Sequence, residues 1–285
     1  MKNLLLKTTA FCGIMFSFWA CQKDISTNKP SSVNSFSEDS YTELSFTVQT
    51  PISGAINANI GGYLEALPAT YSGHPNKRYP LIIYLHGLGN LGDGSITSLL
   101  NLQKGGIAGL IAQKKFPSNF YVNDKTFQFI VLSPQFKQWP LATDVNDMLN
   151  YAIKKYRIDT AKVYICGSSM GGGATWDFTI DYGKRAAAIV PIAGASWPTT
   201  DKALKIAQSG ACVWAFHNIG DSTVPEWYSQ NYVSYINSDK PRIPARLTVF
   251  PVSGHNAWTT ALDPNYTENG QNIYEWMLMR RDINY

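Results

Sequence analysis

The sequence predicts an α/β protein with a mostly parallel central sheet and helices on both faces. Short apolar runs of strand length recur along the chain and are separated by longer helical stretches, an alternation that is typical of parallel sheets. These runs cover residues 81–85, 129–132, 163–166, 187–192, 212–216 and 246–250. Right-handed crossovers between successive parallel strands place the intervening helices on both faces of the sheet.

The segment before the first of these runs predicts an antiparallel hairpin. Leu44, Phe46 and Val48 alternate with polar residues, and residues 62–67 alternate again. Such alternation is typical of strands that are buried on one face. The intervening residues 51–59 carry the Gly and Asn that favour a turn.

Two segments have clear helical character. Residues 141–156 begin with two acidic side chains, which favour a helix N-terminus, and place apolar side chains on one face (Val145, Leu149, Ala152 and Ile153). Residues 272–279 predict a C-terminal helix. No internal repeat, low-complexity tract or second composition regime follows Ser40, so residues 41–285 are interpreted as one domain of the α/β class.

The N-terminus predicts export. Lys2 and Lys7 flank Leu4-Leu5-Leu6, and residues 8–20 carry no charge. Residues 1–20 therefore have the layout of a secretory signal. Those 13 residues would extend about 20 Å as a helix, too short for a hydrocarbon core of about 30 Å. A removable signal is therefore predicted in place of a transmembrane anchor.

Cys21 follows the small Ala20 and resembles the lipidated cysteine of bacterial lipoproteins, although Phe18 and Trp19 depart from the usual motif. The polar residues 21–40 have the composition of a flexible linker. The resemblance implies a lipid anchor to a membrane and a periplasmic or cell-surface location. Plain secretion is the alternative.

Composition and charge narrow the class of function. Hydrophobic residues make up 45% of the chain and charged ones 15%, which favours a globular core over disorder. The net charge of +4 falls to +2 without Lys2 and Lys7, so no nucleic-acid partner is predicted. Cys166 and Cys212 lie in no metal-binding spacing. Neither a metal site nor a disulfide between them is expected.

Ser169 is the predicted nucleophile. It lies in Gly167-Ser168-Ser169-Met170-Gly171, a G-x-S-x-G motif that follows an apolar run and precedes a helical stretch. Small residues on both sides allow the sharp strand-to-helix turn that exposes a nucleophilic serine. The motif is short enough to occur by chance, so the interpretation depends on partners elsewhere in the chain. Ser168 is the poorer candidate.

A serine nucleophile needs a general base and an acid that orients the base. His255 follows the last strand and is the strongest candidate for the base, whereas His217 is expected to pack or hydrogen-bond locally and His74 to be a solvated loop residue. Asp221 follows the strand at 212–216 and is the candidate acid. All three follow the carboxyl ends of strands, which in a parallel sheet lie at one edge.

The loop after residues 81–85 predicts an oxyanion hole. His86-Gly87-Leu88-Gly89 places a backbone N–H near Leu88 that, with the N–H of Met170, could hold a tetrahedral oxyanion. His86 is then structural and shapes the loop through its ring nitrogens. The chain order Ser169, Asp221, His255 is that of the α/β-hydrolases.

The resemblance extends over residues 63–279. The chain is similar to bacterial esterases and "predicted peptidases" related to feruloyl and polyhydroxybutyrate-depolymerase-type esterases. The residues that carry the similarity are Tyr79-Pro80-Leu81, His86-Gly87, Ser133-Pro134-Gln135, Trp139, Tyr156-Arg157-Ile158-Asp159, residues 167–176, Trp214-Ala215-Phe216-His217, Asp221-Ser222-Thr223-Val224-Pro225 and Gly254-His255-Asn256-Ala257-Trp258. The resemblance implies an α/β-hydrolase fold and hydrolysis of carboxylic esters without a metal or organic cofactor. The chain departs from it at Asn218, where many relatives have Gly, and at an insertion over residues 90–118.

The sequence defines the substrate-binding residues less well than the candidate catalytic residues. Trp139, Trp197, Trp227 and Trp258 all follow strands and either line a pocket or pack under loops. Trp139 and Trp258 are the candidate substrate-binding residues, for a phenolic acyl group or a sugar of a feruloylated or acetylated polysaccharide. A serine peptidase on the same scaffold and a non-catalytic binding lipoprotein are the alternatives.

Overall fold

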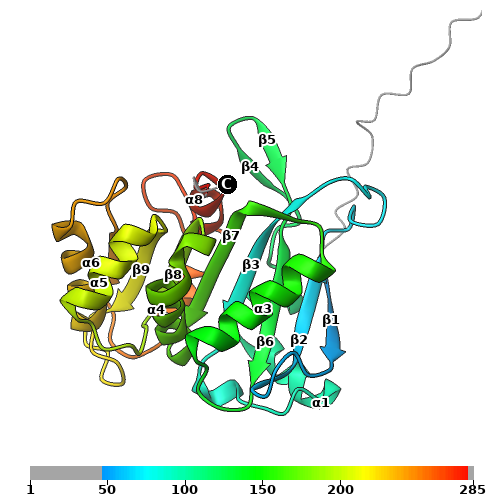
Figure 1. Cartoon of the computed structure of the whole chain (residues 1–285), viewed down its shortest axis with the longest axis horizontal. Coiled ribbons are helices and arrows are strands. Elements are labelled where there is room, and N and C mark those ends of the chain that lie inside the picture. The colour runs from blue at the N-terminus through cyan, green and yellow to red at the C-terminus, as the bar shows by residue number, and fades with distance from the viewer. Residues whose placement is uncertain (1–46, 282–285) are drawn as a thin grey trace, which may run out of the picture. The chain divides into compact units, whose positions relative to one another are not determined.

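The structure is a computed structural model, and it describes residues 47–281. Within this range eight strands form the main sheet (Figure 1), in the order β1 (Val48–Ser53), β2 (Ile60–Leu67), β6 (Ile130–Phe136), β3 (Tyr79–Leu85), β7 (Ile158–Ser168), β8 (Ala188–Ile192), β9 (Cys212–Asn218) and β10 (Arg246–Phe250). The predicted signal at 1–20, the candidate lipidation site Cys21 and the predicted linker at 21–40 lie outside the described residues.

The sheet is antiparallel at one end and parallel over the rest. β2 pairs antiparallel with both β1 and β6, and every pair from β6 to β10 is parallel. The predicted mostly parallel sheet and N-terminal antiparallel hairpin are therefore confirmed. Each of the six apolar runs lies in a strand, apart from Phe129 and Ala187, which directly precede theirs.

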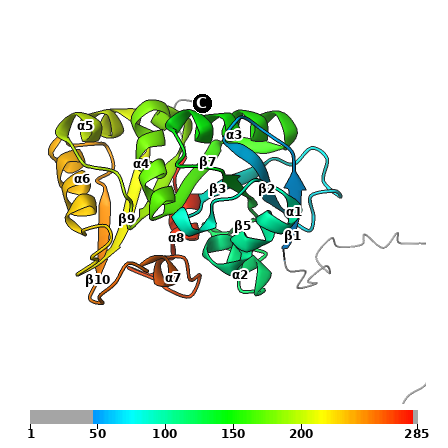
Figure 2. The same cartoon turned by 90° about the horizontal axis from the view of Figure 1, so that it is seen from below.

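Helices cover both faces of the sheet (Figure 2). One core cluster packs against α3 (Ala142–Lys155), α4 (Met170–Tyr182), α5 (Thr200–Ser209) and α6 (Trp227–Ser238). The other core cluster packs against α2 (Gly106–Ala112), α7 (Trp258–Ala261) and α8 (Ile273–Leu278). The predicted α3 buries Val145, Leu149 and Ala152, and the Asp144 carboxylate accepts a hydrogen bond from the Leu141 N–H at 2.9 Å.

The insertion at 90–118 and the residues after it contain elements that the pattern did not predict. It holds the end of η1 (Leu88–Asn90), α1 (Ile96–Leu99), η2 (Leu100–Lys104) and α2, and a short hairpin of β4 (Phe120–Val122) and β5 (Lys125–Phe127) follows it. A further 3-10 turn, η3 (Gly183–Arg185), ends α4. Ile107 and Ile111 of α2 are buried in the second core cluster, so part of the insertion is fixed against the sheet.

The N-terminus of α4 packs very closely on β3. A Cβ atom added at Gly171 would lie 2.0 Å from the carbonyl oxygen of Leu85, a rigid backbone atom. Only glycine fits there without displacing either the helix or the strand.

Gly171→Ala is therefore expected to lower the free energy of unfolding by about 1–3 kcal/mol or more, because overpacking forces backbone shifts. The matched control is Gly73→Ala, where the nearest atom to the added Cβ is 3.8 Å away and the expected change is below about 0.5 kcal/mol. Urea unfolding followed by circular dichroism measures both. Equal stability of the two variants would contradict this account of the α4–β3 contact.

Candidate active site

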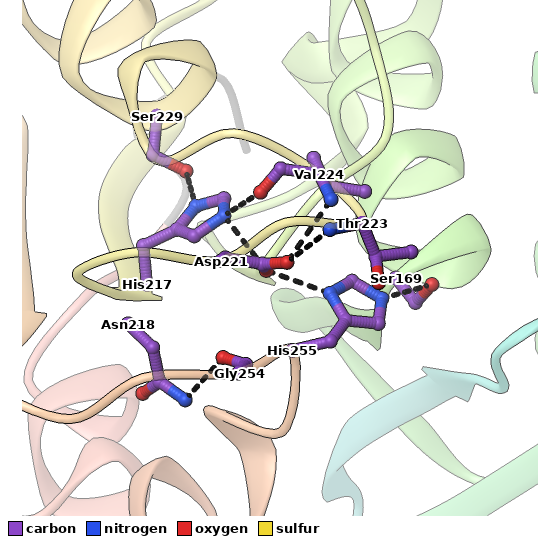
Figure 3. A network of polar contacts seen from close by, with 9 residues as sticks. All are labelled: Ser169, His217, Asn218, Asp221, Thr223, Val224, Ser229, Gly254 and His255. Carbon is purple, nitrogen blue, oxygen red and sulfur yellow. Dashed lines mark hydrogen bonds and ion pairs between the residues drawn. The ribbon is translucent and has the colours of Figure 1, made fainter.

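The candidate catalytic residues meet at the edge formed by the carboxyl ends of the parallel strands. Ser169 follows β7, Asp221 follows β9, and His255 follows β10. In open α/β sheets ligands bind at this edge. The structure brings the three predicted residues into direct contact (Figure 3).

Ser169 occupies a strained turn between β7 and α4. Its φ of 55° and ψ of −116° are unusual for a residue with a side chain. Its N–H donates to the Ile192 carbonyl at 2.9 Å, and its own carbonyl accepts from the N–H groups of Gly173 and Ala195. These bonds fix the turn from both sides, so that the hydroxyl points toward His255.

His255 links the serine to the acid. Its Nε2 lies 2.7 Å from Ser169 Oγ, and its Nδ1 lies 2.7 Å from Asp221 Oδ2. An ionised carboxylate only accepts hydrogen bonds, so Nδ1 carries the proton and Nε2 is free to accept the serine proton. This is the arrangement in which a histidine acts as general base toward a serine.

Asp221 is buried but remains a good acceptor. Burial on its own raises the pKa of this carboxyl, but the hydrogen bond from His255 and those from the N–H groups of Val224 and Thr223 outweigh burial and lower the pKa below its usual value. Asp221 is thus ionised at neutral pH and can stabilise a positive charge on His255.

His217 is hydrogen-bonded to the loop that carries Asp221, which is called the acid loop here. Its Nε2 donates to the Val224 carbonyl at 2.9 Å and lies 3.3 Å from Asp221 Oδ2, while Nδ1 accepts from the Ser229 hydroxyl at 2.8 Å. Burial lowers the pKa of His217 and favours the neutral ring. Local hydrogen bonding was expected for His217, but its contact with Asp221 was not. The i, i+4 spacing of the two residues was the available signal.

Asn218 ties the acid loop to the base loop. Its side-chain amide donates to the carbonyl of Gly254 at 2.8 Å, one residue before the candidate base. A glycine at this position has no side chain to make that bond. The departure from the resembled family at Asn218 therefore has a structural role in this chain.

His86 fixes the loop that carries the candidate oxyanion donor. The N–H of Phe136 donates to His86 Nε2 at 3.1 Å, so the proton lies on Nδ1, which donates to the Gly87 carbonyl at 2.8 Å. Burial lowers the pKa of His86 to about 4, so the ring is neutral at neutral pH. Both ring nitrogens shape this loop.

The two candidate oxyanion residues lie near Ser169. Leu88 lines the same cavity as the serine, and Met170 is the first residue of α4, where backbone N–H groups have no partner within the helix. Their role as donors stays a prediction. Ser168, by contrast, is buried, and its hydroxyl bonds to Tyr84 at 3.0 Å.

A cavity of about 370 Å³ opens above the serine, and Leu88, Ser169, Thr223, His255 and Trp258 are among the residues that line it. The Trp258 ring meets the His255 ring edge to face, with centroids 5.2 Å apart. Trp139 is 44% exposed, and it is not among the described residues that line this cavity. The substrate contact predicted for Trp139 thus has no support from the cavity.

The other candidate residues lie elsewhere. Trp197 and Trp227 pack against each other edge to face at 4.9 Å. Cys166 and Cys212 are buried free thiols. Across residues 47–281 no group of three or more His, Cys, Asp or Glu side chains is arranged to hold a metal ion, and no helix in that range is long and apolar enough to cross a membrane.

Comparison with solved structures identifies the fold. A thermostable esterase superimposes with a TM-score of 0.57 at 20% identity; the match covers 84% of this chain but only 64% of that esterase. A feruloyl esterase module from Clostridium thermocellum, complexed with sinapinate, gives 0.52 at 17% identity, covering 77% of this chain and 84% of the module.

A substrate-bound, fluorophosphonate-binding serine hydrolase of Staphylococcus aureus gives a TM-score of 0.53 at 14% identity, covering 81% of this chain and 97% of that protein. No family model matches the sequence, and no curated protein matches it. The chain has the α/β-hydrolase fold, as the sequence predicts. At these identities the likeness defines the fold alone.

The burial of His86 predicts a pH-dependent stability. The folded protein binds a proton at His86 only below about pH 4, while an unfolded chain does so near pH 6.5. Between these values the unfolded state binds more protons, so the free energy of unfolding decreases as the pH falls, by about 3 kcal/mol in total. In His86→Gln that decrease is expected to be smaller by about this amount.

Urea titrations at pH 7, 5.5 and 4.5 measure the effect. His74→Gln removes an exposed histidine and is the matched control, with the pH dependence of the wild type expected. A His86→Gln variant whose stability falls with acid as steeply as the wild type would contradict the assigned cause.

Proposed function

We propose that this protein is a serine hydrolase that cleaves carboxylic esters through an acyl-enzyme on Ser169. The observation that carries the proposal is the continuous hydrogen-bonded series Ser169–His255–Asp221, with 2.7 Å at each contact, at the opening of a cavity. A nucleophile, a base and an orienting acid in this geometry support acyl transfer.

Each group has one role in the proposed reaction. His255 Nε2 takes the serine proton as Ser169 Oγ bonds to the ester carbonyl carbon, and the carbonyl π electrons move to oxygen. Backbone N–H groups at Leu88 and Met170 stabilise that oxyanion. Protonated His255 then donates its proton to the departing alcohol, which leaves the acyl group on Ser169. Water repeats the steps with His255 as base and releases the acid.

Ester decorations of polysaccharides, feruloyl or acetyl, are the proposed substrates. Trp258 supports this choice because its aromatic ring lines the cavity beside the candidate base, where a phenolic or sugar ring could pack. Two of the superimposable structures, an esterase and a feruloyl esterase module, support an ester substrate. The proposed reaction needs no cofactor.

Ser169→Ala is expected to lower kcat/KM by roughly 10⁴-fold or more on p-nitrophenyl acetate or methyl ferulate, because the nucleophile is lost while the fold remains. Ser168→Ala removes the neighbouring hydroxyl, which bonds to Tyr84, and should cost far less. A fluorophosphonate reagent should add its mass to the peptide that contains Ser169. Labelling of Ser168 in its place, or no labelling of an active preparation, would reject the assignment.

We also propose that Cys21 carries a lipid that anchors the exported protein to a membrane. The full-length protein should then partition into detergent, because each buried CH₂ of the acyl chains contributes about 0.8 kcal/mol. Cys21→Ser should release the protein or block its processing, whereas Cys12→Ser, within the predicted signal, should leave the partitioning unchanged. Wild-type protein that is soluble with an unmodified N-terminus would reject the anchor.

A further inference from the structure

A second cavity of about 360 Å³ adjoins the one above Ser169. The two cavities share Gly106 and Trp258 in their linings, so they are neighbours that border the same Trp258 side chain. The end of α2 and the segment after it supply Gln113 and Lys115. α7 and the turn after it supply Thr259, Asp263 and Asn265.

The lining of this cavity suits a neutral, hydroxylated ligand with an apolar face. Trp258, Leu110 and Leu262 supply apolar surface. Amide, hydroxyl and carboxylate groups line the rest, with one positive and one negative side chain. The C–H face of a sugar ring packs on an aromatic ring, while its hydroxyls bond to planar amide and carboxylate groups. A charged ligand would meet both signs, and an aliphatic chain would leave the polar groups unused.

The polar groups are partly held in place before any ligand binds. Asp263 Oδ1 accepts hydrogen bonds from both the backbone N–H and the side-chain amide of Asn265, at 2.9 and 3.0 Å. Trp258 is half-buried and fixed edge to face against His255. Less ordering is then required when a ligand binds.

We propose that this second cavity binds the sugar residue that carries the scissile ester. The inference rests on the proposed function, because the sugar is then the alcohol part of the substrate attacked by Ser169. With the ester carbonyl above Ser169, the attached sugar passes Trp258 and enters the neighbouring cavity. The insertion at 90–118 would thereby determine which alcohol is recognised, while the triad determines the reaction.

The test compares pairs of esters that share an acyl group and differ in the alcohol. The feruloyl pair is methyl ferulate and the 5-O-feruloyl ester of methyl arabinofuranoside. The acetyl pair is ethyl acetate and a monoacetylated methyl xyloside. Gln113 is exposed and lines the second cavity only. Gln113→Trp should fill that cavity and lower kcat/KM on the glycosyl ester at least about 10-fold, with the simple ester within about threefold. Gln113→Ala should cost about 3- to 10-fold on the glycosyl ester alone.

Gln208→Trp is the matched control, since Gln208 is also an exposed glutamine near the end of a helix, α5, and lines neither cavity. It should leave both rates unchanged. Equal losses on both esters in Gln113→Trp, or no preference of the wild type for the glycosyl alcohol, would overturn the subsite.

Binding separates failure of the subsite from failure of the proposed function. Calorimetry with Ser169→Ala should detect the feruloyl arabinoside, and adding Gln113→Trp should weaken that binding at least about 10-fold. Binding that is unaffected by Gln113→Trp overturns the subsite even if the esters are hydrolysed. Binding that is weakened while the wild type hydrolyses neither ester supports the subsite and rejects the esterase.

Discussion

The site depends on one constraint, the tight turn that carries Ser169 from β7 into α4. A residue with a side chain at φ 55° and ψ −116° costs on the order of 1–3 kcal/mol, and the surrounding structure has to supply that energy. The stabilisation that offsets this strain is local. Backbone hydrogen bonds to Ile192 and Ala195 hold both sides of Ser169, and Gly171 allows α4 to lie against Leu85. The same contact that fixes the turn also builds the core between α4 and the sheet.

The second requirement is a buried negative charge that stays ionised. Burial alone would neutralise Asp221, but its carboxylate accepts hydrogen bonds from His255, Thr223 and Val224. Two of those donors, Thr223 and Val224, lie on the same loop as Asp221, so much of its hydrogen bonding is local. Asn218 then joins this loop to Gly254, which couples the positions of the acid and the base. The electrostatics and the geometry of the pair therefore have one structural origin.

The sequence predicts the sheet and the meeting of Ser169, Asp221 and His255 at one edge, because both follow from strong local signals. Strands buried on both faces appear as apolar runs, and the carboxyl ends of parallel strands bring Ser169, Asp221 and His255 to one edge wherever they lie in the chain. The elements of the insertion were not predictable in this way. Helices of four to seven residues have little stability of their own and form because side chains such as Ile107 and Ile111 are buried against the sheet.

The same distinction explains why the candidate catalytic residues are easier to predict from the sequence than the residues that line the cavity. Ser169, Asp221 and His255 lie in the turn or loop after a strand of the sheet, so residue type and spacing are sufficient to propose them as catalytic. Trp139 and Trp258 have the same sequence signature, an aromatic residue shortly after a strand, yet only Trp258 lines the cavity. Residues of α2, from the insertion, line the neighbouring cavity together with Trp258 and Thr259 of α7. The residues that line the cavities thus depend on how an unpredicted segment packs, which a single sequence does not encode locally.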